Sequence, residues 1–398
     1  MVEPSVPRRI LPVIVLSQFA GTSLWFAVNA VMPDLQQAWG LPAAAVGTLT
    51  SAVMLGFVAG TLVFALLMLA DRFAAPRVFM LCSLLGAVAN AAMLWADGSL
   101  TVLLVLRFLV GFLLAGIYPV GMKIAASWYT SGLGSALGLL IGALVLGTAL
   151  PYGLRALAGG AIALPWQGVV LAVSGLAALG GLATAWLVPM PAQPPRSAPL
   201  TPRALAQVWT DRRLRASVFG YFGHMWELYA FIVLVPLILG TRLSAVGAVS
   251  AGAFWVIGAG FAGCVGGGLL VRRFGSARVA QVQLAASGLC GLIAPWMLVA
   301  PLPLFMAWLL VWGATVAGDS PQFSALTAHN APKAVVGSVL TFTNCIGFLI
   351  AVLTIQMFVA ASQAWPLAAV LPWLALGPAV GLWMMRALLT REGTRAGI

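Results

Sequence analysis

Four ionisable residues of this sequence lie inside long apolar runs, and these are the residues most able to do chemistry. They are His224 and Glu227 in GYFGHMWELYAF, Asp319 in GDSPQ, and Arg107 in LRFLVGFLLAGIYP. Residues three apart are neighbours on a helix, so His224 and Glu227 are expected on one face. If the runs cross a membrane, each charge costs about 2.5–3.5 kcal/mol even on lenient insertion scales, and a functional site is the default interpretation.

The chemistry that these residue types favour is proton transfer. Loss of water disfavours the charged form of a carboxyl group, so a carboxyl in a partly dry cavity can load and release a proton near neutral pH. Glu227 and Asp319 are therefore predicted to couple to protons, with His224 as a relay. Structural alternatives stay open: a Glu227–His224 hydrogen bond, an Asp319 that satisfies a helix broken by Pro321, and an Arg107 that anchors helices rather than an anion or a proton.

The elements that position these residues are predicted to be transmembrane helices. The chain has 398 residues, 62% hydrophobic and only 7% charged, whereas soluble domains carry about 25% charged residues. A spanning helix needs about 20 apolar residues, and helices satisfy their own backbone within the bilayer. The sequence predicts an all-α membrane protein with twelve spans: 11–32, 46–69, 78–96, 101–122, 131–152, 166–188, 214–238, 246–270, 279–299, 303–326, 335–360 and 365–387.

Basic residues predict the orientation of these spans. With the N-terminus in the cytoplasm, 17 of the 20 basic residues fall on the cytoplasmic side and only Arg155 and Arg242 fall outside, as the positive-inside rule expects. The formal charge of +12 is thus explained by the bilayer, and a nucleic-acid partner is not expected. Arginine outnumbers lysine and alanine is abundant, as in GC-rich bacterial genomes, so we expect the inner (cytoplasmic) membrane of a bacterium. Both termini are expected in the cytoplasm, and the chain is expected to be a monomer.

Cofactor and metal chemistry are not expected. The four cysteines, Cys82, Cys264, Cys290 and Cys345, each lie within a predicted span at no metal-ligand spacing, and small buried hydrophobes of this kind are common. No phosphate-binding loop, zinc pattern or catalytic triad is present. The sequence therefore predicts a protein that is not an enzyme.

Two similar halves make up the chain. The Pro- and Arg-rich stretch 189–213 is predicted as a cytoplasmic linker between an N-terminal six-helix bundle, 1–188, and a C-terminal one, 214–398. Three pairs of segments match at offsets of 203, 201 and 202 residues: FAGTSLWFAVNAVMP with FGHMWELYAFIVLVP, LADRFAAPRV with LVRRFGSARV, and GFLLAGIYP with GATVAGDSP. One common register indicates duplication. Paired repeats with a site between them near the bilayer midplane are a transporter architecture.

The chain resembles the major facilitator superfamily over essentially its whole length. LMLADRFAAPR (67–77) resembles the family's loop motif between its second and third helices, with Leu67 and Ala74 replacing glycines. GLLVRRFGSAR (268–278) is the second copy, with an arginine in place of the acid. LRFLVGFLLAGIYP resembles the family's fourth-helix motif, and 138–153 only partly resembles its antiporter motif. The resemblance implies a cytoplasmic gate, or simply basic residues that set topology, at these positions: Asp71, Arg72, Arg77, Arg272, Arg273 and Arg278.

The resemblance also implies where the ionisable residues lie. In the superfamily helices 1, 4, 7 and 10 line the central cavity, and Arg107, His224, Glu227 and Asp319 all fall on helices 4, 7 and 10. We therefore expect all four to face one cavity. Further residues are predicted to contact a substrate there: Gln18, Trp25, Asn29, Tyr118, Trp226, Tyr229 and Gln322.

These patterns predict a secondary active transporter that works by alternating access. We expect proton coupling, by symport or antiport, and a small organic substrate; two carboxylates and an arginine favour a cationic or zwitterionic compound, with export as one direction. One alternative is proton-coupled uptake of a small anion bound through Arg107. A non-transporting sensor derived from a transporter is the other.

Overall fold

The computed structural model describes residues 7–129, 133–158, 165–190 and 199–389, and within these ranges every regular element is a helix. Eleven of the helices are long and apolar enough to cross a membrane. The remaining predicted span, 279–299, which is the ninth in chain order, forms α13 (Ser276–Leu292) and the short α14 (Ala294–Met297), which are separated by Ile293. The predicted all-α architecture of two six-helix bundles is confirmed.

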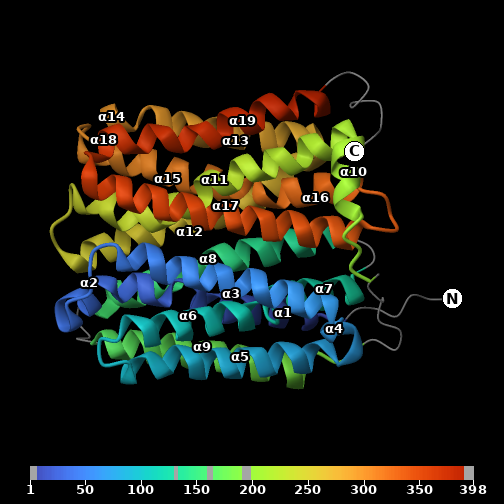
Figure 1. Ribbon diagram of the computed structural model, residues 1–398, viewed down its shortest axis with the longest axis horizontal. Helices are drawn as coiled ribbons and strands as arrows, with labels where there is room; N and C mark the ends of the chain where they lie inside the picture. The colour runs from blue at the N-terminus through green and yellow to red at the C-terminus, as the bar shows by residue number, and fades with distance from the viewer. Residues whose placement is uncertain (1–6, 130–132, 159–164, 191–198, 390–398) are drawn as a thin grey trace.

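Helices of the first bundle follow the predicted spans closely. Figure 1 shows them packed side by side with their axes roughly parallel. Their bounds are α1 (Ile10–Thr22), η1 (Ser23–Phe26), α2 (Ala27–Trp39), α3 (Ala45–Leu66), α4 (Leu69–Arg72), α5 (Ala75–Ala91), η2 (Ala92–Trp95), α6 (Leu100–Leu114), α7 (Tyr118–Trp128), α8 (Leu133–Ala158) and α9 (Trp166–Leu187).

The second bundle repeats this arrangement. The predicted linker precedes it, and the part of that linker within the described residues contains a short helix, α10. The bounds 188 and 214 of the two bundles stay predictions. The elements are α10 (Ala204–Thr210), α11 (Arg212–Gly240), α12 (Val246–Phe274), α13, α14, α15 (Leu302–Gly318), α16 (Ser320–Asn330), α17 (Val336–Ala364), α18 (Leu367–Val370), η3 (Leu371–Ala375), α19 (Leu376–Met385) and η4 (Arg386–Leu388).

Three of the spans that could line a central cavity are broken near their middle. The first changes from α-helix to 3₁₀-helix at Ser23–Phe26. The fourth breaks between α6 and α7, and the tenth between α15 and α16 at Asp319. Pro119 and Pro321 each stand in the first turn after the break, where a missing N–H costs nothing. Such breaks leave backbone N–H and C=O groups without helical partners and place helix ends inside the protein.

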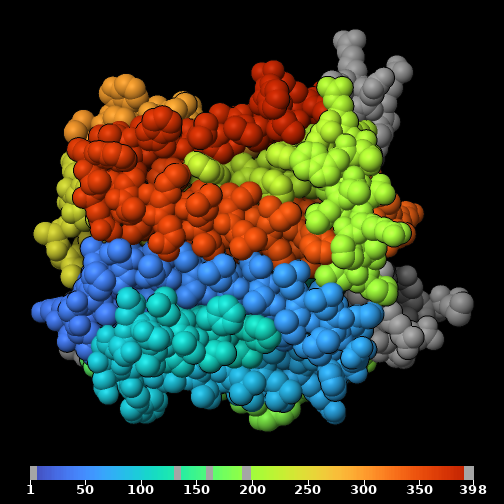
Figure 2. All heavy atoms as spheres, viewed as in Figure 1, coloured from blue at the N-terminus to red at the C-terminus, as the bar shows by residue number. Residues whose placement is uncertain are grey.

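The halves meet along two helix pairs. α8 packs against α12 and α3 packs against α17, and Figure 2 shows the atoms of α3 and α17 meeting along the boundary on the visible face. The Gln356 amide on α17 donates a hydrogen bond of 2.7 Å to the Ser51 hydroxyl on α3. Ser51 lies near the start of α3, which follows α2, and Gln356 lies in the last third of α17, which precedes α18. Figure 1 shows α2 and α18 at one end of the molecule and α4 and α10 at the other.

Candidate functional site

A small polar cavity lies between the two halves. It leaves about 40 Å³ to the centre of a water molecule, enough for at least one water, which needs about 10–15 Å³. Its walls come from α7 and α8 of the first bundle and from α11, α15, α16 and α17 of the second. Polar lining residues are Tyr118, Tyr221, Ser320, Ser324 and Asn344. The Tyr221 hydroxyl donates to Asn344 Oδ1 at 2.8 Å.

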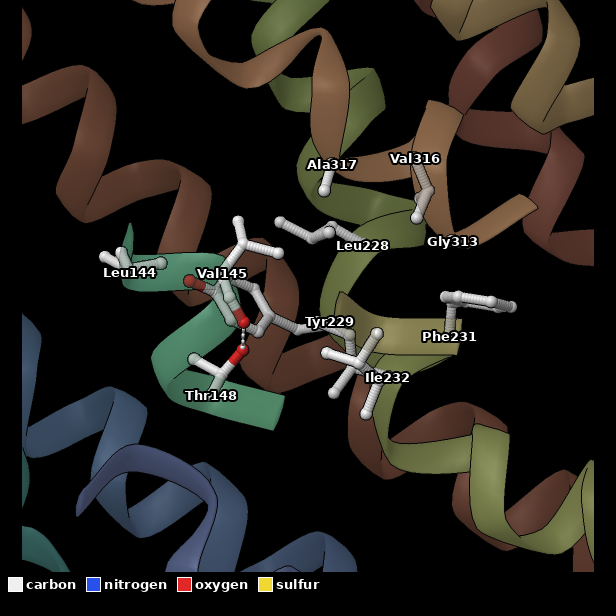
Figure 3. Close-up of a pocket in the computed structure, with 11 residues that line it drawn as sticks. Leu144, Val145, Thr148, Leu228, Tyr229, Phe231, Ile232, Gly313, Val316 and Ala317 are labelled. Atoms are coloured by element: carbon white, nitrogen blue, oxygen red, sulfur yellow. Dashed lines mark hydrogen bonds between the residues drawn. The ribbon is translucent and has the colours of Figure 1, made fainter. Parts of the chain in front are cut away.

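A second, apolar cavity adjoins the first. It leaves about 20 Å³ and is lined by α8, α11, α12 and α15. Figure 3 shows its residues, with Leu144, Val145 and Thr148 facing Leu228 and Ile232 across the boundary of the halves. None of the described residues that line either cavity is charged.

Aromatic rings close the space between the halves next to these cavities. Trp25, at the break of the first span, stacks on Tyr229 at a centroid distance of 6.1 Å and on Phe348 at 5.5 Å. Phe57 packs against Trp25 at 4.9 Å and against Phe348 at 4.6 Å. We call Trp25, Phe57, Tyr229 and Phe348 the aromatic cluster; it joins α3 and the first span to α11 and α17. Each such ring pair contributes about 0.5–1.5 kcal/mol beyond burial.

His224 and Asp319 form a buried pair directly behind the wall of the polar cavity. His224 Nδ1 lies 2.8 Å from Asp319 Oδ1, and both side chains are almost wholly buried. Tyr221, one turn before His224, and Ser320, next to Asp319, are both lining residues of the polar cavity. His224 Nε2 and Asp319 Oδ2 have no hydrogen-bond partner among the described residues. Orphaned buried polar atoms are rare and point to a functional role or a water site.

Glu227 lies one turn further along α11 but faces the interior of the second bundle. Trp312 Nε1 on α15 donates to Glu227 Oε1 at 2.7 Å, and the Ser287 hydroxyl on α13 lies 2.8 Å from Oε2. The same hydroxyl also lies 3.1 Å from the Leu284 carbonyl oxygen. An ionised Glu227 accepts from Ser287, whereas a neutral Glu227 donates to Ser287, which then donates to Leu284. The site therefore satisfies both protonation states by rotation of one hydroxyl.

Arg107 faces the interior of the first bundle. Its guanidinium donates to the Leu24 carbonyl at 3.1 Å, to the Trp25 carbonyl, and to Asn90 Oδ1 at 3.2 Å. Leu24 and Trp25 belong to the 3₁₀ turn that breaks the first span. A charged donor thus holds carbonyl groups that the break exposes, which is the anchoring alternative left open by the sequence.

None of the four predicted residues Arg107, His224, Glu227 and Asp319 lines either of these two cavities, and the prediction that all four face one cavity stays a prediction. Of these four residues, only His224 and Asp319 contact each other. Glu227 and Arg107 each lie inside a separate bundle, among partners from other helices of the same bundle. A helix has several inward faces in a bundle, and helix number alone does not distinguish the face toward the partner half from the face toward the helix's own bundle.

The predicted substrate contacts divide in the same way. Tyr118 and Tyr229 line the polar cavity, and Trp25 stacks on Tyr229. The others are not lining residues: Gln18 packs against Gly121, Asn29 donates to Thr50 at 2.7 Å, Trp226 donates to the Trp373 carbonyl at 3.3 Å, and Gln322 donates to the Gly318 carbonyl at 3.1 Å.

Sequence reasoning missed several residues of this region. Ser320, Ser324 and Asn344 line the polar cavity, and Ser287 and Trp312 hold Glu227. Asn344 is one of two amides in the eleventh span, with Gln356, a signal that the sequence offered. Ser287 and Trp312 are residue types too common in membrane helices to stand out.

At the α4 end, the predicted gate motif includes an ion pair. Asp71 pairs with Lys123 in the middle of α7, so the segment after α3 is held against the fourth span. Arg72 follows Asp71 in α4 and Arg77 lies in the first turn of α5, while Arg272 and Arg273 lie in the last turn of α12 and Arg278 in the first turn of α13. Gating by these residues stays a prediction. Within the described part of the chain, no group of three or more His, Cys, Asp or Glu residues could hold a metal ion.

Comparison with known proteins agrees with this architecture. The family model of the Major Facilitator Superfamily matches residues 14–355, and the chain belongs to this superfamily of transporters. The human organic anion transporter MFSD10 (TETRAN) is similar in structure, with a TM-score of 0.74 and 16% identity over 96% of this chain and 100% of that one. The E. coli fucose:proton symporter FucP has a TM-score of 0.66 and 16% identity over 96% and 99%. At this identity the likeness shows the fold alone. No protein of curated function matches the sequence significantly.

Proposed function

We propose that this protein is a proton-coupled secondary transporter of a small organic solute, working by alternating access in a bacterial inner membrane. The observation that carries the proposal is the His224–Asp319 pair beside a polar cavity at the boundary of the two halves. A cavity at that boundary is the place where a rocking motion alternates access. The order in which the proton and the solute leave the site decides between symport and antiport, and between import and export.

The pair offers a physical link between proton and conformation. With one shared proton the two side chains together are neutral, and a closed, dry boundary tolerates them. When the proton leaves, an unbalanced negative charge stays buried, which costs several kcal/mol. Water must then reach the pair, which favours separation of the halves on one side.

Two alternatives are less well supported. Uptake of an anion through Arg107 needs its guanidinium to face the substrate, but both of its terminal nitrogens already donate to Leu24, Trp25 and Asn90. Only Nε has no partner among the described residues. The preference for a cationic or zwitterionic substrate depended on carboxylates in the cavity, and the described lining residues are uncharged. A non-transporting sensor would bind a solute without moving it.

Proton flux into proteoliposomes tests the proposal. The protein is reconstituted with the pH-sensitive dye pyranine inside, and sugars, amino acids, amines, carboxylates and uncharged aromatic alcohols are added in turn. We expect at least one compound to drive proton movement in the wild type and none to do so in Asp319→Asn. Exchange of that compound across the membrane should survive in Asp319→Asn, because the variant keeps a neutral pair.

Gly175→Ala is the matched control, because a methyl group there meets no atom within 4 Å. Proton flux that is equal in Asp319→Asn and the wild type would contradict the proposal. Solute binding without any flux would favour the sensor instead.

A further inference from the structure

The two cavities between the halves form one site with a polar end and an apolar end. They share five lining residues, Leu144, Val145, Leu228, Tyr229 and Ala317, so the two cavities are adjacent. A molecule that occupied both cavities would extend from one into the other past Tyr229.

The polar end offers hydrogen bonds but no charge. Three of its lining residues, Tyr118, Ser320 and Ser324, carry a hydroxyl group, which can both donate and accept a hydrogen bond. Asn344 accepts from Tyr221 through its oxygen, and within the described residues its NH₂ group has no acceptor. An ion placed here would lose its water without gaining an opposite charge, which is costly.

Apart from the Tyr229 hydroxyl, the apolar end offers no free polar side chain among its described lining residues. Its only hydroxyl besides that of Tyr229 belongs to Thr148, and Thr148 donates to the Val145 carbonyl at 2.7 Å, the bond drawn in Figure 3. Phe231, Ile257 and Val316 complete the wall. Apolar cavities of this kind stay dry and bind apolar groups.

We propose that the substrate is an uncharged amphipathic compound, with a hydroxyl, carbonyl or amide group in the polar end and a compact apolar group in the apolar end. This inference rests on the proposed transport function and names the substrate class for its site. The apolar void is small, so an added methylene on its wall should compete directly with the apolar group of the substrate.

A series of four related probes tests the substrate class in lipid nanodiscs. They are 3-phenylpropane-1,2-diol, glycerol, 3-phenylpropylamine and 3-phenylpropionate: the amphipathic diol, its polar part alone, and a cationic and an anionic relative. A ligand that binds only the folded protein raises the unfolding temperature. We expect the diol to raise it and the other three to have no effect at the same concentration.

Two valine variants on α15 then locate the apolar group. Val316→Ile adds a methylene to the apolar wall and should abolish stabilisation by the diol. Val311→Ile, at a half-exposed position on the same helix, should leave it unchanged.

Three results would overturn the proposal: no stabilisation by the diol, equal stabilisation by a charged relative, or a diol effect that survives in Val316→Ile. Each of these leaves the transport function intact if another compound still drives proton flux that depends on Asp319. Loss of all such flux would instead remove the transport function itself.

Discussion

At the scale of single residues, the buried charges of the two bundles hold helices together in equivalent ways. Arg107 on the fourth span binds carbonyl groups of the first span and Asn90 of the third. Two hundred residues later, Trp312 on the tenth span binds Glu227 of the seventh, which also contacts Ser287 of the ninth. Each bundle thus has a cluster of buried polar contacts across its first, third and fourth helices, and the His224–Asp319 pair adds a further contact in the second bundle. These contacts favour movement of each bundle as a rigid body.

Substitution of Glu227 tests whether this residue is a structural contact between helices (a tie) or a proton carrier. A glutamine keeps the oxygen that accepts from Trp312 and can donate to Ser287, so Glu227→Gln should change the free energy of unfolding by less than about 1 kcal/mol. Glu227→Leu orphans the Trp312 N–H and should cost about 1–3 kcal/mol. Thermal unfolding measures both variants.

The same glutamine variant reports on proton coupling through Glu227, which stays a prediction. If Glu227 is a tie, proton flux in Glu227→Gln should match the wild type. Flux lost in Glu227→Gln but retained in Asp319→Asn would reverse the roles that we assign to the two carboxyl groups.

Arg107 is expected to stabilise the break in the first span. Arg107→Met leaves the Leu24 and Trp25 carbonyls without their donor, and each orphaned buried group costs about 1–3 kcal/mol. Arg107→Lys keeps the charge but lacks the planar fork of donors, so its melting temperature should lie between those of the wild type and Arg107→Met. Equal stability of all three proteins would show that the contacts contribute nothing.

At the scale of helices, the duplication is visible in how closely backbones approach. A methyl group on Gly111 would overlap the Val53 carbonyl oxygen, and one on Gly313 would overlap that of Val256. These two crossings, α3 with α6 and α12 with α15, lie 202–203 residues apart, the offset found between the sequence repeats. Small residues permit this contact, which is the usual basis of helix packing in membranes.

Gly111→Val and Gly313→Val should therefore be similarly harmful. Each side chain would force two backbones apart, so we expect loss of folded protein, or a clear fall in melting temperature, for both. Gly175→Ala should behave as the wild type. Size-exclusion profiles and thermal unfolding check this, and tolerance of valine at either crossing would show that the helices can separate there without cost.

The sequence predicted these elements well because its signals were local. Apolar length predicted twelve spans, eleven of which form helices long enough to cross a membrane, and Pro321 marked one of the helix breaks. The break before Pro119 was not predicted. The ninth span was harder, since Pro295 in α14 follows a break at Ile293 and leaves α13 with only 17 residues. The 3₁₀ turn at Ser23–Phe26 carries no proline or other sequence signal; contacts with Arg107 on another helix accompany it.

At the scale of the whole molecule, the structure is a closed arrangement of two halves. The aromatic cluster and the Gln356–Ser51 hydrogen bond join them, and the small volumes of both cavities match a closed state. Helix number could not predict which residues line the site, because the direction in which a side chain points depends on how one half packs against the other. Residue type did identify Tyr118, Tyr229, His224 and Asp319 near the site.

A covalent link across this boundary should stop transport. Ser51→Cys combined with Gln356→Cys places two thiols where a short bismaleimide can join α3 to α17. Treatment should abolish proton flux in the double variant and spare both single variants. Full activity after complete cross-linking would show that the halves need not separate at this position.

The distance between the halves as a function of pH tests the central claim most directly. Spin labels at Gln37→Cys and Ser244→Cys, both exposed at the α2 end, report that distance by pulsed electron resonance in lipid. We predict two distances whose populations change between about pH 5.5 and pH 8.5, and loss of that pH dependence in Asp319→Asn. A single distance at every pH, or an unchanged pH response in Asp319→Asn, would contradict the account.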